Sequence, residues 1–251
     1  EIPYSHIENS PNNQLDLNYN LEISNLINKI RNNCELYGNI CNVKDGIIQS
    51  KIPDLLFLKD RKDEFSKKIL FGRDIDSYKI NWNNNWVNYN EVAMKSAEAL
   101  RGGNGLRLRN SSLFENKKIL TRQTSDSIIA AYDVDNFYYA NTLHGAVIQD
   151  KSYNPLYLLG ILNSKLITFY YRTITAEEGK VFAQVKIELL KLLPIKKTKE
   201  QQKIIDIVNA LINHANIDDI KIYDNYIMHI DLMVYKLYDL SYAEVFVVDP
   251  E

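Results

Sequence analysis

The sequence predicts an α+β fold, in which a mixed or antiparallel sheet carries inserted loops and is followed by a C-terminal helical hairpin. Short apolar pairs broken by Gly, Pro, Asp and Asn fill residues 37–89, which indicates short strands and loops. Apolar side chains at helical spacing occupy residues 20–33 and much of the chain after residue 198. Strands in the middle of the chain and helices towards its ends are the pattern of an α+β protein.

The N-terminal half begins with a polar segment. Residues 1–19 are rich in Asn and read as an exposed lead-in. The apolar stripe within 20–33 predicts a helix, and a second helix is expected over 91–101, where the glycines of Gly102–Gly105 end it.

The clearest strand signal lies in residues 119–148. Short β-branched and aromatic runs at 119–123, 128–132, 137–139 and 146–148 predict strands joined in an antiparallel meander. Pro155 then opens an apolar segment, which predicts one helix over 156–171.

The C-terminal part predicts a pair of packed helices. Thr198 and Gln201 have the spacing of a capping box, and two apolar faces at helical spacing follow. We therefore divide the chain into a lead-in segment (1–19), an α+β body (20–197) and a helical hairpin packed on that body (198–251).

Charge is distributed unevenly along the chain. The 251 residues have a formal net charge of −2, but residues 51–122 hold 15 basic and 9 acidic side chains, and residues 201–251 hold 3 and 9. A polyanion can bind the middle of the chain if its cations share one surface, and the alternative is that these charges lie on solvated faces. The acidic hairpin is not expected to be the DNA face.

Composition disfavours several classes of protein. No apolar run approaches the roughly 18–20 residues that a membrane span needs. Cys34 and Cys41 are the two cysteines of the chain and cannot form a disulfide framework. We expect a cytoplasmic protein without membrane contact. The chain begins at Glu1 instead of Met, which suggests a piece of a longer protein.

The chain shows no convincing catalytic constellation. Asn154-Pro155-Leu156-Tyr157 differs by one residue from the Asn-Pro-Pro-Tyr motif of amino-methyltransferases, but no Gly-rich AdoMet loop accompanies it. Asp54, Glu115 and Lys117 formally match the split Asp…Glu-x-Lys pattern that holds Mg²⁺ in nucleases, although the gap between the two acids is long.

Six ordered segments resemble motifs of one family. They are Tyr37-Gly38-Asn39-Ile40-Cys41 with Gly46-Ile47; Leu70-Phe71-Gly72-Arg73-Asp74-Ile75 with Tyr78; residues 113–123 (LFENKKILTRQ); residues 157–165 (YLLGILNSK); residues 180–186 (KVFAQVK) with Leu193-Pro194-Ile195; and residues 230–240 (IDLMVYKLYDL). Together they resemble the TaqI-like C-terminal specificity domain of adenine-N6 DNA methyltransferases and fused restriction-modification enzymes, over about residues 30–245. The sequence departs from that pattern at Asp76-Ser77, where a basic pair is usual, at Ala183, where Pro is usual, and at Asp239, where Gly is usual.

The resemblance implies a target-recognition domain that clamps double-stranded DNA against the N-terminal methyltransferase domain of the same protein, which flips out the adenine. That catalytic domain, with AdoMet as its cofactor, would lie outside this chain. This chain alone is therefore expected to be non-catalytic and to hold no cofactor or metal, with Mg²⁺ required only if a nuclease is fused.

DNA contacts are expected from basic and amide side chains, because their donors and acceptors match phosphates and base edges. The candidates are Arg73, Lys79, Arg101, Asn104, Arg107, Arg109, Lys117, Lys118, Arg122, Gln123, Lys180, Gln184 and Lys186.

The loop around Gly102–Gly105 is the DNA-contact candidate with the most detailed support in the sequence. If Leu106 and Leu108 face inward on a short strand, Arg107 and Arg109 share the outward face, where DNA could receive both. The alternative is a surface hairpin whose arginines pair with Glu98 and Glu115.

Two alternatives to DNA recognition remain open. A restriction nuclease would use Asp54, Glu115 and Lys117, and Mg²⁺-dependent cleavage would reveal it. A protein-interaction module, as in a specificity subunit, would assemble through the acidic hairpin and would associate with its partner independently of salt.

Overall fold

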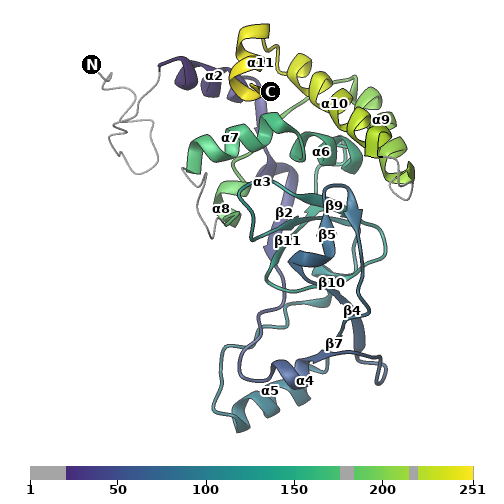
Figure 1. Cartoon of the computed structure of the whole chain (residues 1–251). Coiled ribbons are helices and arrows are strands. Elements are labelled where there is room, and N and C mark those ends of the chain that lie inside the picture. The colour runs from purple at the N-terminus through teal and green to yellow at the C-terminus, as the bar shows by residue number, and fades with distance from the viewer. Residues whose placement is uncertain (1–20, 176–183, 215–219, 251) are drawn as a thin grey trace.

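The computed structural model describes residues 21–175, 184–214 and 220–250. Most of its helices gather at one end of an elongated molecule, and β-rich structure forms the other end (Figure 1). The helices are α2 (Leu21–Arg31), α3 (Tyr37–Ile40), α4 (Pro53–Leu56), α5 (Glu91–Leu100), α6 (Pro155–Leu162), α7 (Lys165–Thr175), α8 (Ile187–Leu190), α9 (Gln201–His214), α10 (Ile220–Leu237) and α11 (Tyr242–Val248), with short 3₁₀ turns η2 (Gly72–Asp74) and η3 (Ser111–Leu113). The predicted α+β fold is confirmed.

The strands form small sheets. They are β1 (Cys34–Leu36), β2 (Cys41–Asp45), β3 (Phe57–Leu58), β4 (Ser66–Leu70), β5 (Ile75–Asp76), β6 (Lys79–Ile80), β7 (Trp86–Asn88), β8 (Lys118–Arg122), β9 (Ala130–Asp133), β10 (Tyr138–Tyr139), β11 (Leu143–Ile148) and β12 (Pro194–Lys196). The two larger sheets have the strand orders β2-β11-β8-β9 and β10-β4-β7-β3, while β1 pairs with β12 and β5 pairs with β6.

The antiparallel sheet β2-β11-β8-β9 lies between two hydrophobic cores. Because side chains alternate across a strand, neighbouring residues of β8 and β9 enter different cores. Ile119 and Ala130 belong to the core that the helices complete. Leu120 and Ala131 belong to the second core, on the other face of the sheet. This explains why these strands read as continuous apolar runs in the sequence.

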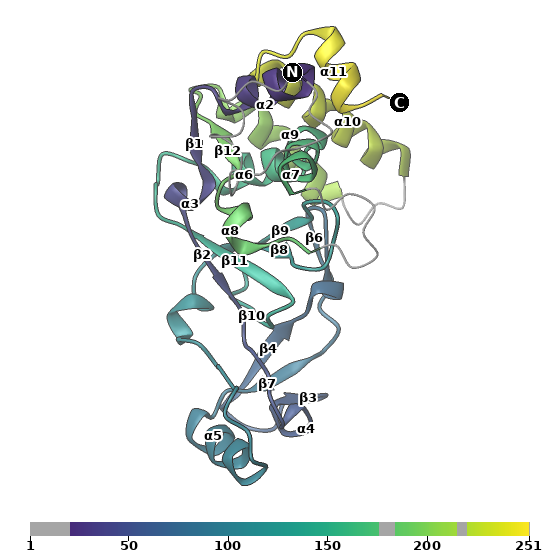
Figure 2. The same ribbon diagram turned by 90° about the vertical axis from the view of Figure 1, so that its left-hand side faces the viewer.

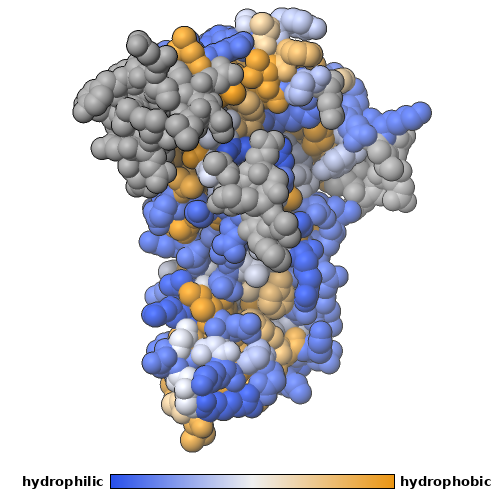
Figure 3. Space-filling view, turned by 60° about the vertical axis from the view of Figure 1, so that its left-hand side comes forward, coloured by the Kyte–Doolittle hydropathy of each residue, from blue (hydrophilic) through white to orange (hydrophobic). Residues whose placement is uncertain are grey.

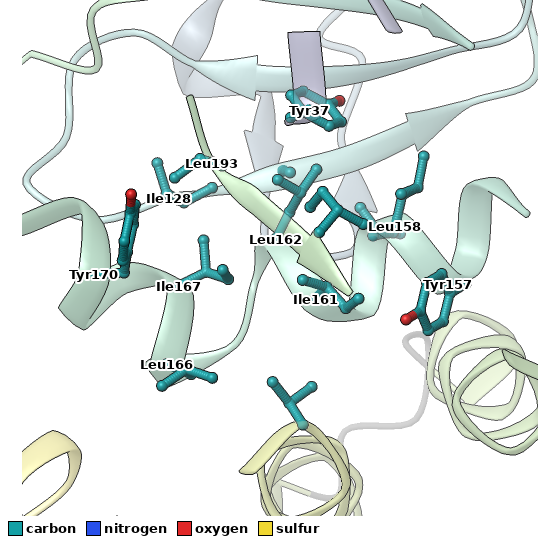
Figure 4. Close-up of a cluster of buried hydrophobic side chains, with 14 of the residues drawn as sticks. Tyr37, Ile128, Tyr157, Leu158, Ile161, Leu162, Leu166, Ile167, Tyr170 and Leu193 are labelled. Carbon is teal, nitrogen blue, oxygen red and sulfur yellow. The ribbon is translucent and has the colours of Figure 1, made fainter. Parts of the chain in front are cut away.

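The helical core joins the two ends of the chain. α6 packs on β8 and β9, and α9 packs on both α6 and α10. Figure 4 shows side chains from α6 and α7, among them Leu158, Leu162 and Ile167, pointing towards Tyr37 and Leu193 from distant parts of the sequence. The expected hairpin is therefore a packing element, because Val208 and Val234 are completely buried in this core.

The second core fills what we call the distal lobe, which comprises residues 47–114 together with β10. Phe114 stacks on Tyr138 with ring centroids 4.4 Å apart and meets Tyr139 edge-on. α4 and α5 lie at the far tip (Figure 2). Hydrophilic side chains predominate over the middle and distal parts of the face drawn in Figure 3, with smaller apolar patches between them.

The prediction that the strands of residues 119–148 form an antiparallel meander is wrong. After β9 the chain leaves the central sheet, and β10 pairs in parallel with β4, Tyr138 lying opposite Ile69. The chain then returns as β11, which lies between β2 and β8. Burial of Tyr138 and Tyr139 in the distal core accounts for this excursion.

Two local expectations at helix ends also need correction. The helix expected over 156–171 is two helices, separated at Asn163 and Ser164. α9 begins at Gln201, and Thr198 accepts a hydrogen bond from the Glu200 N–H at 3.0 Å, so the two residues do not form the expected capping box. None of the described helices combines the length and apolarity that a membrane span requires.

Candidate nucleic-acid interface

The edge strand β2 borders a polar groove. Along β2, Cys41 and Val43 are buried while Asn42 and Lys44 are exposed, because alternate side chains of an edge strand face the core and the solvent. α8 packs beside β2 on the face turned towards the viewer in Figure 2. The loop that leads into η3 completes the opposite wall.

The groove has two adjoining parts, which we call the β2 groove. The first is a cavity of about 560 Å³. Its polar lining consists of Asn42, Lys44, Asp45, Arg109, Asn110, Ser112, Asn116, Gln149, Glu188 and Lys191. The second, of about 360 Å³, shares Asp45, Ile187 and Glu188 with the first. It brings together Gln123, Gln184 and Lys186, which were predicted from separate parts of the sequence.

Both carboxylates of the β2 groove are engaged by cations or hydrogen-bond donors of the protein. Asp45 lies 2.8 Å from Nδ1 of His144, and Glu188 lies 3.6 Å from the ammonium of Lys191. Among the described residues Lys44 has no acidic partner, so the groove presents amides and cations whose charge is not fully balanced. Such a surface suits the phosphates and base edges of DNA.

The predicted alternation after the glycine loop is present. Leu106 and Leu108 are buried, and Arg107 and Arg109 are exposed. Arg107 exchanges two backbone hydrogen bonds with Ile48, each 3.0 Å long. The backbone of Arg109 is left-handed (φ 67°), and its side chain lines the β2 groove while Nε donates to the Gly46 carbonyl at 3.2 Å.

The alternative pairing of these arginines with Glu98 and Glu115 is wrong. Glu98 instead accepts the backbone N–H groups of Gly105 and Leu106, both at 2.8 Å, and so fixes the glycine loop to α5. Glu115 accepts the Tyr138 hydroxyl at 2.9 Å.

Arg101 contacts α4. Its guanidinium donates two bonds to Asp54, at 2.5 and 2.9 Å, and these bonds lower the pKa of that carboxyl. Asn104 is exposed in the loop. Asp54, one of the acids of the nuclease pattern, is thus paired with Arg101. Among the described residues, no group of three or more His, Cys, Asp or Glu side chains could hold a metal ion.

The assignment of Lys118 to DNA binding is wrong. Its ammonium is fully buried, donates to the Phe114 carbonyl at 2.6 Å and pairs with buried Asp133 at 2.6 Å. It begins a strand that is covered on both faces, so the side chain cannot reach a ligand in solution. Arg122, at the other end of the strand, is only partly exposed and braces β5 by donating to Asp76 at 3.0 Å and to the Ile75 carbonyl.

The remaining candidates lie outside the β2 groove. Arg73 is exposed, with its guanidinium 5.2 Å from the Phe71 ring. Lys79 is half-buried on β6, and Lys117 is exposed after η3. Lys180 lies outside the described residues.

Several residues that line the β2 groove were not predicted from the sequence. Asn42, Lys44, Gln149 and Lys191 contact the same cavity but come from three distant segments. The alternation of Asn42, Val43 and Lys44 was the available signal, since it marks a strand with one solvent-facing side. The other residues carried no local pattern.

Comparison with known proteins agrees with this arrangement. The family described as the TaqI-like C-terminal specificity domain matches residues 67–195, just over half of the chain. No curated protein sequence matches. Among solved structures, the type IIL restriction-modification enzyme MmeI in complex with DNA aligns with a TM-score of 0.54 at 10% identity, covering 82% of this chain and 34% of MmeI.

Two further solved structures are similar at lower scores. The type IIG restriction endonuclease BpuSI aligns with a TM-score of 0.49 at 10% identity, over 86% of this chain and 33% of that one. The HsdS subunit from Thermoanaerobacter tengcongensis aligns with a TM-score of 0.37 at 12% identity, over 86% and 50%. The chain therefore spans about a third of MmeI and of BpuSI.

At 10% identity the likeness to MmeI shows a shared fold. The family match covers the distal lobe from residue 67 onwards, the strands β8, β9 and β11 of the central sheet, α6 and α7. On that match, this chain belongs to the TaqI-like C-terminal specificity domains, which recognise DNA sequence in restriction-modification enzymes.

Proposed function

We propose that this chain reads the DNA target of an enzyme whose catalytic part is an AdoMet-dependent adenine-N6 methyltransferase domain of the same protein, acting in the cytoplasm. The β2 groove is the observation that carries the proposal. It places exposed amides and cations along one edge strand, and protein contacts already engage its two carboxylates. DNA would then meet a surface with few unpaired negative groups.

The two kinds of groove side chain have different tasks in this proposal. Lys44 and Arg109 contact phosphates and set the register of the duplex. Asn42 and Gln149 carry amides, which match the donor and acceptor pattern of adenine in the major groove. AdoMet is bound by the methyltransferase domain, and Mg²⁺ takes part only where a nuclease is fused.

Mapping of methylated adenines tests the proposal. The full-length enzyme is expressed in cells, and the sequence context of every modified adenine is determined. Asn42→Ala is expected to relax the methylated motif at one position, since loss of a base contact removes roughly 1–3 kcal/mol of discrimination. Lys44→Ala should lower methylation of all sites alike.

Asn209→Ala provides the matched control, because Asn209 is an exposed amide on α9, away from the groove. Methylation of cytosines alone would contradict the proposed adenine-N6 chemistry. An unchanged motif in both Asn42→Ala and Gln149→Ala enzymes would contradict base reading by the groove.

A further inference from the structure

His144 connects three segments at the floor of the β2 groove. Its ring, on β11, is almost completely buried, with Nδ1 2.8 Å from Oδ1 of Asp45 and Nε2 2.7 Å from the Val185 carbonyl. Asp45 ends β2, whereas Val185 lies in the connection that precedes α8. One imidazole thus links the edge strand to that connection.

The segment 184–186 is fixed at several further points. The Val185 N–H donates to the Gln123 carbonyl at 2.7 Å. The Tyr171 hydroxyl donates to the Gln184 carbonyl at 3.1 Å and accepts the Lys186 N–H at 3.0 Å. Val185 is fully buried between two exposed neighbours, so Gln184 and Lys186 are held with their side chains towards the groove.

His144 has a different partner at each ring nitrogen. The Val185 carbonyl can only accept a hydrogen bond, so Nε2 donates to it, while Nδ1 faces the Asp45 carboxylate. Lys186 and Glu188 are the other charged side chains that line this part of the groove.

We propose that His144 is a positioning residue for target recognition, which holds Gln184 and Lys186 in the geometry that contacts DNA. This inference rests on the proposed function of the β2 groove. Without the imidazole, the edge strand and the segment 184–186 lose the side chain that joins them. Discrimination between target and altered DNA is then expected to fall.

The experiment uses the full-length enzyme and two duplexes, one with the methylated sequence and one with a single altered base pair. The ratio of their affinities is measured for the unmodified enzyme and for each variant. His144→Leu should lower this ratio roughly three- to tenfold, the size expected for one hydrogen bond.

Asp45→Asn is the conservative variant. An Asn amide can donate to Nδ1 while Nε2–H still donates to Val185, so both contacts of the ring are kept. This variant should keep the ratio of the unmodified enzyme. Tyr171→Phe, which removes two hydrogen bonds of the same segment, should also lower the ratio.

Two outcomes would overturn the inference. One is a ratio for Asp45→Asn as low as that for His144→Leu. The other is normal discrimination by a folded His144→Leu enzyme, with folding checked by thermal melting. If the unmodified enzyme does not distinguish the two duplexes at all, the proposed function fails instead.

Discussion

Lys118 and Asp133 form a fully buried ion pair in the central sheet. Burial lowers the pKa of Lys118, and the nearby carboxylate opposes that fall. Asp133 also accepts the backbone N–H groups of Asp135 and Phe137, both at 2.9 Å, so it shapes the turn after β9. Removal of the lysine would therefore leave a buried carboxylate without a cation.

Lys118→Met should lower the free energy of unfolding by about 3–5 kcal/mol, the cost of breaking a buried pair from one side. Urea unfolding measures this. Lys117→Met is the control, because Lys117 is exposed and its loss should stay within about 0.5 kcal/mol. If the Lys118→Met protein is as stable as the unmodified chain but binds DNA more weakly, this prediction is wrong and Lys118 contacts DNA.

Asp231 makes the stability of the fold depend on pH. Burial raises the pKa of Asp231 to about 6, and the nearby charge of Asp249 contributes to this rise. The Asp231 carboxylate accepts the backbone N–H of Lys165 at 2.8 Å at the start of α7, and this bond partly opposes the rise in pKa. Because the folded pKa exceeds the unfolded value of 3.8, this group stabilises the fold below about pH 4. That contribution is lost as the pH rises through 6.

Asp231→Asn should remove this dependence, since an amide oxygen can accept the same N–H without a charge. The stability of the variant relative to the unmodified chain should rise between pH 4 and pH 7, by at most about 3 kcal/mol at 1.36 kcal/mol per pKa unit. Chemical denaturation at each pH gives the difference. Parallel stability curves for the two proteins would show that Asp231 does not titrate as argued.

At the level of elements, the sequence predicted helices more reliably than strand order. Periodic apolar residues located α2, α9 and α10, and the glycines that follow α5 marked its end, because each helix carries its own signal. The position of β10 could not be predicted, since its pairing with β4 joins segments about seventy residues apart and depends on the distal core. The break between α6 and α7 has the same kind of cause: the Asn163 side chain exchanges hydrogen bonds of 2.8 and 2.9 Å with the backbone of Ala130.

Four of the residues predicted to contact DNA lie in the candidate site, namely Arg109, Gln123, Gln184 and Lys186, and their contact with DNA stays a prediction. Lys118 was misassigned because a buried lysine and an exposed one look alike in sequence. The departure at Asp239 was informative, because this residue adopts φ 57° after α10, a left-handed conformation that explains the Gly usual in the family.

Gly160 sets the distance between α6 and α9. A Cβ atom at this position would lie 2.7 Å from Cγ2 of Ile204 and 3.0 Å from Cγ2 of Val208. Both atoms belong to short, branched side chains in the buried face of α9, so they cannot move aside without shifting the helix. The two helices can pack this closely only without a side chain here.

Gly160→Val should therefore lower the free energy of unfolding by about 1–3 kcal/mol, the usual cost of overpacking a core. Asn209→Val places the same side chain on the exposed face of α9 and should have little effect. Urea denaturation of both variants makes the comparison. Equal stability of the two would show that the helices separate at little cost.

For the whole molecule, opposite charge densities lie in different parts of the structure. Most of the basic residues of 51–122 belong to the distal lobe, whereas Lys118 and Arg122 lie on β8 of the central sheet. Several acidic groups of this region already have partners in the protein, as Asp54, Asp76, Glu98 and Glu115 illustrate. The helices α9 and α10 lie at the other end (Figure 1). DNA should therefore contact the distal lobe and central sheet.

Replacing Arg73, Arg107 and Lys117 together by Gln should weaken binding of all duplexes by the full-length enzyme. It should also reduce the slope of log affinity against log salt by about one for each phosphate that the protein no longer neutralises. The control replaces Lys199, Lys203 and Lys236, which are exposed on or next to the C-terminal helices. Titrations with labelled duplex at several salt concentrations measure both slopes. A larger fall in slope for the control would place the duplex at the helical end.

Trp82 and Trp86 are the two tryptophans of the chain, and their rings meet edge-on in the distal lobe with centroids 5.4 Å apart. Indole emission consequently reports on that lobe alone, whereas far-ultraviolet circular dichroism is dominated by the helices at the other end. Since β8 and β9 contribute side chains to both cores, the two optical signals should change at one temperature on heating. The same emission gives a dye-free signal of DNA seated against the distal lobe.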